Sequence, residues 1–131
     1  MADVLIVDDN ADLRDLLAGL LESAGHKVRK AGNGRQGMDL VSQRTPDLAL
    51  LDVEMPVLNG PEMAYGLFLR DHGDERIPII LLSGIVGLSE VAKVVGTPYF
   101  LTKPYSPEAL LGIVNRALTE HISPSPRLEA P

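Results

Sequence analysis

The sequence predicts an α/β fold, a doubly wound parallel sheet of five strands with helices on both faces. The first observation is that short apolar runs alternate with segments of helical periodicity along the whole chain, as in proteins built from βα units. The second is that several of these runs contain no alternating polar residues, which is expected of strands covered on both faces. The third is that acidic, hydroxyl and lysine residues stand directly after the runs.

The first βα unit has the clearest signals. Residues 4–7 are aliphatic, include β-branched side chains and are bounded by acids, so they predict a buried strand. A leucine-rich stretch with helical spacing follows. Asp9 or Asn10 can cap this helix, and Gly25 ends it.

The other elements follow by the same reasoning. Strands are predicted at residues 26–31, 47–51, 77–82 and 99–101. Between them, Asn33-Gly34 predicts a turn and residues 36–44 predict a weaker helix. Further helices are predicted after Pro61, at residues 88–95 and after the Ser106-Pro107 pair, which supplies a cap and a first-turn proline.

Composition limits the functional classes. The chain has 131 residues, the size of one domain, and no cysteine, so disulfides, thiolate nucleophiles and Cys-ligated zinc are excluded. The net charge of −6, with scattered lysines and arginines, argues against nucleic-acid binding. We find no signal peptide and no apolar run long enough to span a bilayer, so we expect a cytoplasmic protein without a membrane partner.

Chemically useful side chains follow four of the predicted strands. They are Asp8 and Asp9, Asp52, Ser83 and Gly84, and Lys103 with Pro104. Because the carboxyl ends of parallel strands meet at one edge of a sheet, we expect these residues to converge. Three close carboxylates repel one another, and a hard divalent cation such as Mg²⁺ relieves that repulsion. With an ammonium and a hydroxyl nearby, one carboxylate could carry a phosphoryl group as an acyl phosphate.

The chain resembles the receiver domains of two-component response regulators. Four motifs carry the resemblance: VLIVDDN at 4–10, LLDVEMP at 50–56, LLSG at 81–84 and LTKP at 101–104. The resemblance covers residues 3 to about 120, and the motifs occur in the family's order and at nearly its spacing. The resemblance implies a flavodoxin-like (βα)5 fold with strand order 2-1-3-4-5, a receiver domain at 1–121 and a Pro-rich tail or linker at 122–131.

The resemblance also implies residue roles. Asp52 would accept phosphate from a sensor histidine kinase or a histidine phosphotransfer protein. The implied ligands of Mg²⁺ (or Mn²⁺) are Asp8, Asp9, Asp52 and the backbone carbonyl of Glu54, with Asp8 acting mainly through water. The implied phosphate-binding residues are Val53, Ser83, Gly84 and Lys103. Such a domain catalyses its own phosphorylation and dephosphorylation without being a classical turnover enzyme.

The implied switch links the site to a partner surface. Ser83 would move toward the phosphoryl group, Phe100 would change rotamer with it, and the peptide bond before Pro104 would be cis. The downstream partner protein is unnamed, and a homodimer is a further option. No DNA-binding module fits after the last helix, and the chain could also be a receiver cut from a hybrid kinase.

The sequence departs from the family pattern between Ser83 and Lys103. Only 20 positions separate them, roughly half a helical turn fewer than in many relatives. The apolar residues Ile85, Val86 and Leu88 in this segment predict either an exposed partner site or a segment folded into the core. The side chain of Glu54 lies either at the mouth of the site or in solvent.

Other functions make different demands on the sequence. A pseudo-receiver binds partners without taking phosphate, yet here every acid and the lysine are present. A haloacid-dehalogenase-like hydrolase needs Asp-x-Asp after its first strand, whereas Asp52 follows the third. A flavodoxin-type flavin domain needs a Ser/Thr/Gly loop where this chain has Asp8 and Asp9. The three histidines, His26, His72 and His121, have no common spacing and are predicted on the surface.

Overall fold

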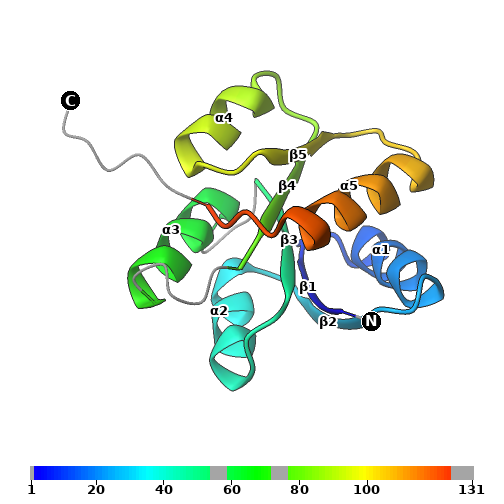
Figure 1. Ribbon diagram of the computed structural model, residues 1–131, viewed down its shortest axis with the longest axis horizontal. Coiled ribbons are helices and arrows are strands. Elements are labelled where there is room, and N and C mark those ends of the chain that lie inside the picture. Colours follow the sequence, from blue (N-terminus) through cyan, green and yellow to red (C-terminus); the bar gives the residue numbers. More distant parts are fainter. Residues whose placement is uncertain (1, 54–58, 72–76, 125–131) are drawn as a thin grey trace.

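The computed structural model contains a five-stranded parallel sheet flanked by five helices (Figure 1). It describes residues 2–53, 59–71 and 77–124, without the side chains of 67–71. The strands are β1 (Asp3–Val7), β2 (Lys27–Ala31), β3 (Leu48–Asp52), β4 (Ile79–Ser83) and β5 (Tyr99–Thr102). The helices are α1 (Ala11–Ser23), α2 (Gly34–Gln43), α3 (Gly60–Asp71), α4 (Leu88–Val95) and α5 (Pro107–Glu120). The predicted α/β class is confirmed.

The strand order is β2-β1-β3-β4-β5, and every neighbouring pair is parallel. This confirms the predicted order 2-1-3-4-5. The chain leaves β1 toward β2 and then returns to β3 on the other side of β1. In such sheets the loops diverge where the order reverses and leave a crevice beyond the carboxyl ends. Val7 pairs with Leu51 in the register of β1 and β3, so the residues that follow them meet at this crevice.

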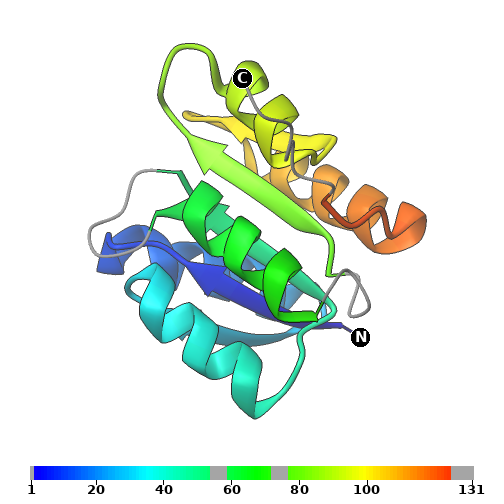
Figure 2. The ribbon, with the colours of Figure 1, turned by 90° about the vertical axis from the view of Figure 1, so that its left-hand side faces the viewer.

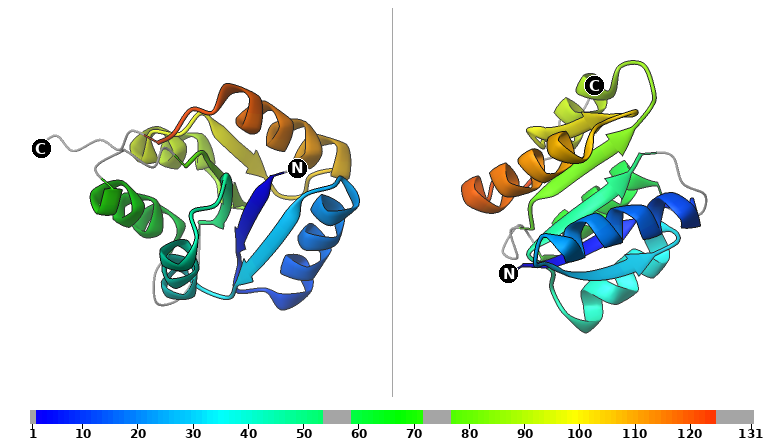
Figure 3. Two further views of the ribbon diagram at one scale, coloured as in Figure 1. Left: turned by 60° about the horizontal axis from the view of Figure 1, so that its bottom comes forward. Right: turned by 90° about the vertical axis from the view of Figure 1, so that its right-hand side faces the viewer.

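Strand side chains alternate between two hydrophobic clusters, one on each face of the sheet. Val4 and Ile6 of β1 belong to the cluster shared with α1 and α5, whereas Leu5 and Val7 belong to the cluster shared with α2, α3 and α4. Figure 2 shows the face covered by α2, α3 and α4, and the right-hand view of Figure 3 shows the face covered by α1 and α5. Burial on both faces explains why these strands are continuously apolar.

Side-chain caps begin four of the helices. Asn10, Asn33 and Ser106 accept hydrogen bonds from backbone N–H groups three residues ahead, at the starts of α1, α2 and α5. At the start of α3, Asn59 and Glu62 each accept from the other's backbone N–H group, a reciprocal capping box. These interactions satisfy N–H groups that a helix leaves without internal partners.

Of the two residues predicted to cap α1, Asn10 is the one that does so. Two other local predictions need correction. The pair Asn33-Gly34 forms a cap and a first helical residue rather than a separate turn, so α2 starts earlier than predicted. The fourth strand begins at Ile79, because Pro78 lacks an N–H group for the ladder, and it extends to Ser83.

The segment before α4 combines both predicted arrangements. Leu88 is buried and Ile85 is partly buried against the cluster beneath α4, whereas Val86 is fully exposed. Gly87 precedes α4 with a φ of 83°, a left-handed conformation that glycine adopts readily. Among the helices of the described part of the chain, none has both the length and the hydrophobicity needed to span a bilayer.

Candidate functional site

Three carboxylates meet at the crevice beyond β1 and β3. Asp8 and Asp9 follow β1, and Asp52 is the last residue of β3. Each offers one oxygen atom, and these three oxygens lie within 4.8 Å of one another. Asp8 is 1% exposed and Asp52 is 6% exposed, while Asp9 is open to solvent. The predicted convergence of these residues is therefore present in the fold.

Asp8 is held by its backbone and by its side chain. Its N–H donates to the carbonyl of Ala31 at 3.1 Å, which continues the pairing of β1 with β2. Its carbonyl accepts a hydrogen bond from Nη1 of Arg14 at 2.8 Å. Its Oδ1 accepts from the backbone N–H of Asn10 at 2.9 Å. Together these bonds fix the carboxylate at the base of the site.

Lys103 supplies the positive charge of the site. Its Nζ lies 3.7 Å from Oδ2 of Asp8 and 3.7 Å from Oδ1 of Asp52, so one ammonium faces both buried carboxylates. Its backbone N–H donates to the carbonyl of Ser83 at 2.8 Å, which ties the end of β5 to the end of β4. The Lys103-Pro104 peptide bond is cis. Close contact between opposite charges lowers the cost of keeping the carboxylates ionised and buried.

Ser83 and Gly84 form the side of the site next to Lys103. Ser83 is 3% exposed, and its Oγ accepts from the backbone N–H of Ile85 at 3.2 Å. Gly84 is exposed, and a Cβ atom added there would lie 3.8 Å from Cβ of Lys103. The serine hydroxyl is therefore engaged with its own loop.

Two residues that support the site were missed in the sequence. Gly60 begins α3, and a Cβ atom there would collide with the carbonyl oxygen of Asp52. Arg14 holds the Asp8 carbonyl, as described above. Tyr105, whose position directly after Lys103-Pro104 suggests either support for that motif or a core role, interacts with the charges of Asp8 and Asp52. An isolated glycine before a helix could have suggested the close approach at Gly60, but no sequence signal identified the partner of Arg14.

The Tyr105 hydroxyl lies in a negative and poorly hydrated environment. Burial, together with the charges of Asp8 and Asp52, raises the pKa of Tyr105 to about 12. The hydroxyl makes no hydrogen bond, and Oδ2 of Asp8 is the other buried side-chain oxygen of the described residues that makes none. The interaction with the charges of Asp8 and Asp52 places Tyr105 beside the acidic cluster.

The oxygen cluster fits a small, hard cation. Mg²⁺ binds oxygens at 2.0–2.1 Å, so two of its ligands can be at most about 4.2 Å apart. The three carboxylate oxygens lie within 4.8 Å of one another. A small inward movement of the side chains would bring them within the distance of about 4.2 Å that two Mg²⁺ ligands can span. The buried Oδ2 of Asp8 is an oxygen available for such a role. A carboxylate set without sulfur or imidazole favours Mg²⁺ or Mn²⁺ over softer metals.

The roles predicted for the remaining site residues stay predictions. The N–H of Val53 donates to the carbonyl of Leu82 at 3.1 Å, so it is engaged in the sheet, and its role in phosphate binding stays a prediction. Phe100 is 37% exposed on the outer strand β5. Glu54, predicted to supply a carbonyl ligand, lies outside the described residues.

The histidines take no part in the described site. His121 is exposed and ends α5 in a left-handed conformation. His26 is partly buried, and its Nδ1 accepts a hydrogen bond from the N–H of Ala2. His72 lies outside the described residues.

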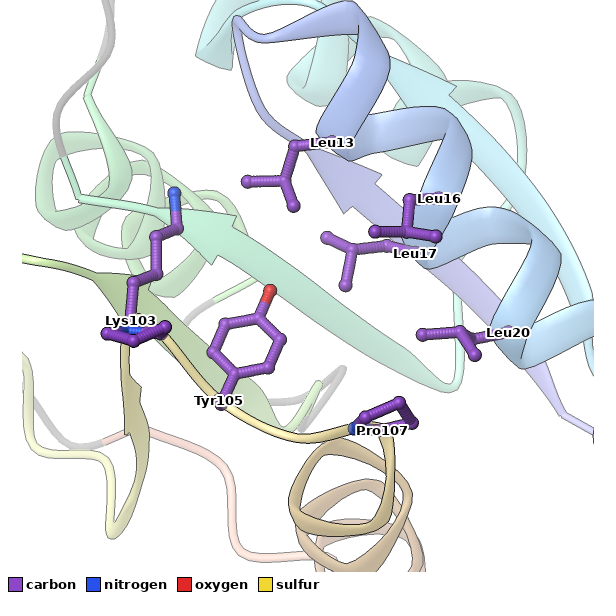
Figure 4. Close-up of a pocket in the computed structure, with 8 residues that line it drawn as sticks. Leu13, Leu16, Leu17, Leu20, Lys103, Tyr105 and Pro107 are labelled. Carbon is purple, nitrogen blue, oxygen red and sulfur yellow. The ribbon is translucent and has the colours of Figure 1, made fainter.

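A pocket of about 380 Å³ borders the site between α1 and the segment that joins β5 to α5 (Figure 4). Its lining residues are Leu13, Leu16, Leu17, Leu20, Lys103, Pro104, Tyr105 and Pro107. Leu16 of this lining is 61% exposed. The site is therefore flanked by an apolar surface.

Comparison with known families gives a consistent result. Residues 4–115 match the family model described as the response regulator receiver domain. The protein PilH of Pseudomonas aeruginosa is 38% identical over 122 residues, which are 90% of this chain and 98% of PilH. The phosphate regulon transcriptional regulatory protein PhoB of the same species is also 38% identical, but the match spans only 51% of PhoB.

Solved structures agree with the sequence relatives. The chemotaxis protein CheY4 of Vibrio cholerae superimposes with a TM-score of 0.81 at 31% identity. The match covers 88% of this chain and 98% of CheY4. The fold is therefore shared with CheY4, and the sequence similarity extends over most of the chain.

Proposed function

The chain belongs to the response regulator receiver domain family, and from this premise we propose that Asp52 accepts a phosphoryl group in a Mg²⁺-dependent reaction. Proteins of this family act in two-component signalling. The observation that carries the proposal is the single ammonium of Lys103, 3.7 Å from both Asp8 and Asp52, beside a third acid within 4.8 Å. An ion-pair network made only for stability would not need a third carboxylate at the same point.

The proposed reaction transfers the phosphoryl group from a phosphohistidine. A carboxylate oxygen of Asp52 forms a bond to phosphorus while the bond between phosphorus and the histidine nitrogen breaks, and the electron pair stays on that nitrogen. Lys103 turns from Asp52 to the incoming phosphoryl oxygens and balances their charge. Ser83 exchanges its contact with Ile85 for one with a phosphoryl oxygen, and the rim at Gly84 leaves room for that group.

The metal belongs to the same proposal. Receiver domains generally bind Mg²⁺ through acidic residues. Here Asp9 and Asp52 would hold the ion directly, and Asp8 would act mainly through water. When bound, the cation neutralises charge on the transferred group. Asp8 stays fixed by Asn10 and Ala31 throughout, so the site does not have to be assembled during the reaction.

The phosphate donor is a histidine kinase or a histidine phosphotransfer protein, as is general for receiver domains. A donor histidine must reach Asp52, so its protein has to cover the mouth of the site. The exposed Leu16 and the pocket beside Tyr105 and Pro107 offer an apolar docking surface within reach of that mouth.

Output passes to a partner protein or to a second copy of the domain. Val86, Val94 and Phe100 are exposed apolar residues near or in α4 and β5, on the side where Ser83 and its loop would move. We assign the receiver to residues 1–121 and a linker to 122–131, in a cytoplasmic protein. The match spans only 51% of PhoB. Any activity of a longer protein that contains this chain is therefore part of the proposal as well.

The test uses acetyl phosphate as a small phosphodonor. The protein is incubated with it in the presence of Mg²⁺ or EDTA, and the intact mass is read. We expect a gain of one phosphoryl group with Mg²⁺ only, and no gain in Asp52→Asn. Asp12→Asn, which changes an exposed acid in the first turn of α1, is the matched control and should be phosphorylated like the wild type.

Beryllofluoride, which imitates a bound phosphoryl group, distinguishes the remaining outcomes. Binding without a stable mass gain would indicate rapid hydrolysis of the acyl phosphate. Failure of both assays in the wild type would refute the phosphoacceptor and favour a pseudo-receiver that binds its partners without phosphate.

A further inference from the structure

Two buried oxygen atoms with unused hydrogen-bonding capacity lie at the same site. They are Oδ2 of Asp8 and the hydroxyl of Tyr105, and no other buried side-chain nitrogen or oxygen of the described residues lacks a hydrogen bond. A buried polar atom without a hydrogen bond typically costs about 1–3 kcal/mol. One atom is an acceptor and the other is a donor, so each could satisfy the other.

Lys103 is the present partner of Asp8 Oδ2. The distance of 3.7 Å makes this an ion pair rather than a hydrogen bond, and the same ammonium lies 3.7 Å from Asp52. One ammonium cannot neutralise both Asp8 and Asp52 once Asp52 has gained the negative charge of a phosphoryl group. When Lys103 turns to that group, Asp8 Oδ2 loses the ammonium that faces it.

Tyr105 is positioned to compensate for that loss. Its ring packs against the cluster shared with α1 and lines the pocket with Leu13 and Leu17, so it is not free to swing into solvent. Figure 4 shows the hydroxyl pointing away from Pro107 toward the space between Lys103 and Leu13. A tyrosine hydroxyl is protonated at neutral pH, so the group is a hydrogen-bond donor.

We infer that Tyr105 is a positioning residue of the phosphorylated state, whose hydroxyl donates a hydrogen bond to Asp8 Oδ2 when Lys103 turns to the phosphoryl group. The inference rests on the proposed function and adds a residue to it. Tyr105 does not contact the phosphoryl group; it acts by holding Asp8, which would reach the metal mainly through water. Outer partners of metal-binding carboxylates commonly change metal affinity by about 10–100-fold.

The inference predicts a difference between two states of one variant. In Tyr105→Phe the ring and its packing remain, and only the donor is lost. Without phosphate analogue, Lys103 still faces Asp8, so the Mg²⁺ affinity should change less than about twofold. With beryllofluoride bound, the Mg²⁺ affinity should fall about tenfold, at the lower end of the usual range for outer partners.

The experiment measures Mg²⁺ affinity with and without beryllofluoride in the wild type, Tyr105→Phe and Tyr65→Phe. Because the chain has no tryptophan, binding is followed by calorimetry or by amide NMR shifts. Tyr65 is an exposed tyrosine of α3 and serves as the matched control, expected to equal the wild type in both states. Thermal unfolding of the metal-free proteins checks that each variant is folded.

Each outcome has one meaning. A loss confined to the beryllofluoride state of Tyr105→Phe supports the inference. An equal loss in both states, or no loss in either, overturns it, because a purely structural role would not depend on the position of Lys103. If the wild type itself binds no beryllofluoride, the proposed function fails and the inference fails with it.

Discussion

Asp8 and Asp52 differ in how they are held, although both are nearly excluded from solvent. Asp8 receives a backbone hydrogen bond at Oδ1 and is fixed through its own N–H and carbonyl groups. Asp52 ends a central strand and faces Lys103. The fixed position of Asp8 is consistent with its proposed role near the metal. The position of Asp52 at the end of a central strand is consistent with its proposed role as an acceptor, because a phosphate donor can reach it from outside the domain.

Substitution of Gly60 tests its close contact with Asp52, the proposed phosphate acceptor. In Gly60→Ala the new Cβ atom would collide with the Asp52 carbonyl oxygen, so the strand end or α3 must move. Overpacking of this kind costs about 1–3 kcal/mol, and we expect that loss of unfolding free energy in urea titrations, together with slower phosphorylation by acetyl phosphate.

Gly19 provides the control for this substitution. It lies on the exposed face of α1, and a Cβ atom there meets nothing within 4 Å. Gly19→Ala should therefore stabilise the protein by about 0.5–1 kcal/mol and leave phosphorylation unchanged. Wild-type stability and wild-type phosphorylation in Gly60→Ala would contradict the proposed role of this close approach.

At the scale of the element, the start of α1 joins helix formation to the site. Asn10 caps the helix by accepting from the N–H of Leu13, and its own N–H donates to Asp8. The same residue thus fixes the first turn of a helix and one oxygen of a buried carboxylate. A shift in the cap would move both.

Asn10→Ala should lower the free energy of unfolding by about 1 kcal/mol, because the side-chain cap is lost. It should also weaken Mg²⁺ binding, since the turn that presents the Asn10 N–H to Asp8 is no longer fixed. Asn33→Ala removes the cap of α2 and should cost similar stability without changing Mg²⁺ affinity. Equal Mg²⁺ affinity in the two variants would show that the cap does not act on the site.

At the scale of the whole molecule, the two hydrophobic clusters carry the fold and the polar site occupies one edge. Side chains of β1, β3 and β4 are buried on both faces, so the sheet is the shared wall of the two clusters. The site is built from residues at the carboxyl ends of β1, β3, β4 and β5.

Stability at alkaline pH should report on Tyr105. Its pKa is about 12 in the folded protein, against an ordinary value of 10.0. Below the ordinary value the hydroxyl is protonated in both states and has no effect. Above it the unfolded chain releases the proton first, so the free energy of unfolding falls as the pH rises toward about 12. Tyr99, whose pKa burial also raises, acts in the same direction.

The measurement compares urea unfolding of the wild type and Tyr105→Phe at pH values between about 9 and 12. The Tyr105→Phe variant should lose less stability across this range. It lacks the hydroxyl that would lose its proton more easily in the unfolded chain than in the folded protein. Parallel curves for the two proteins would contradict the raised pKa. The comparison cancels the other groups that titrate in the same range.

The sequence alone determined the order of the elements, the parallel sheet and the set of residues at its edge. Strands buried on both faces must be apolar throughout, and parallel strands must present their carboxyl ends together. Asp8, Asp52 and Lys103 could therefore be grouped before any contact was known. Element boundaries were less well determined, as at Asn33 and Ile79, because caps and prolines act at single residues.

Only the tertiary structure decided which groups around the site contact one another. The clash at Gly60, the bond from Arg14 to Asp8 and the position of the Tyr105 hydroxyl all join residues on different elements. Such contacts depend on the twist of the sheet and the packing of α1 and α3 against it, which no local pattern in the sequence encodes. Local residue patterns specify elements, whereas the distances between side chains follow from how those elements pack.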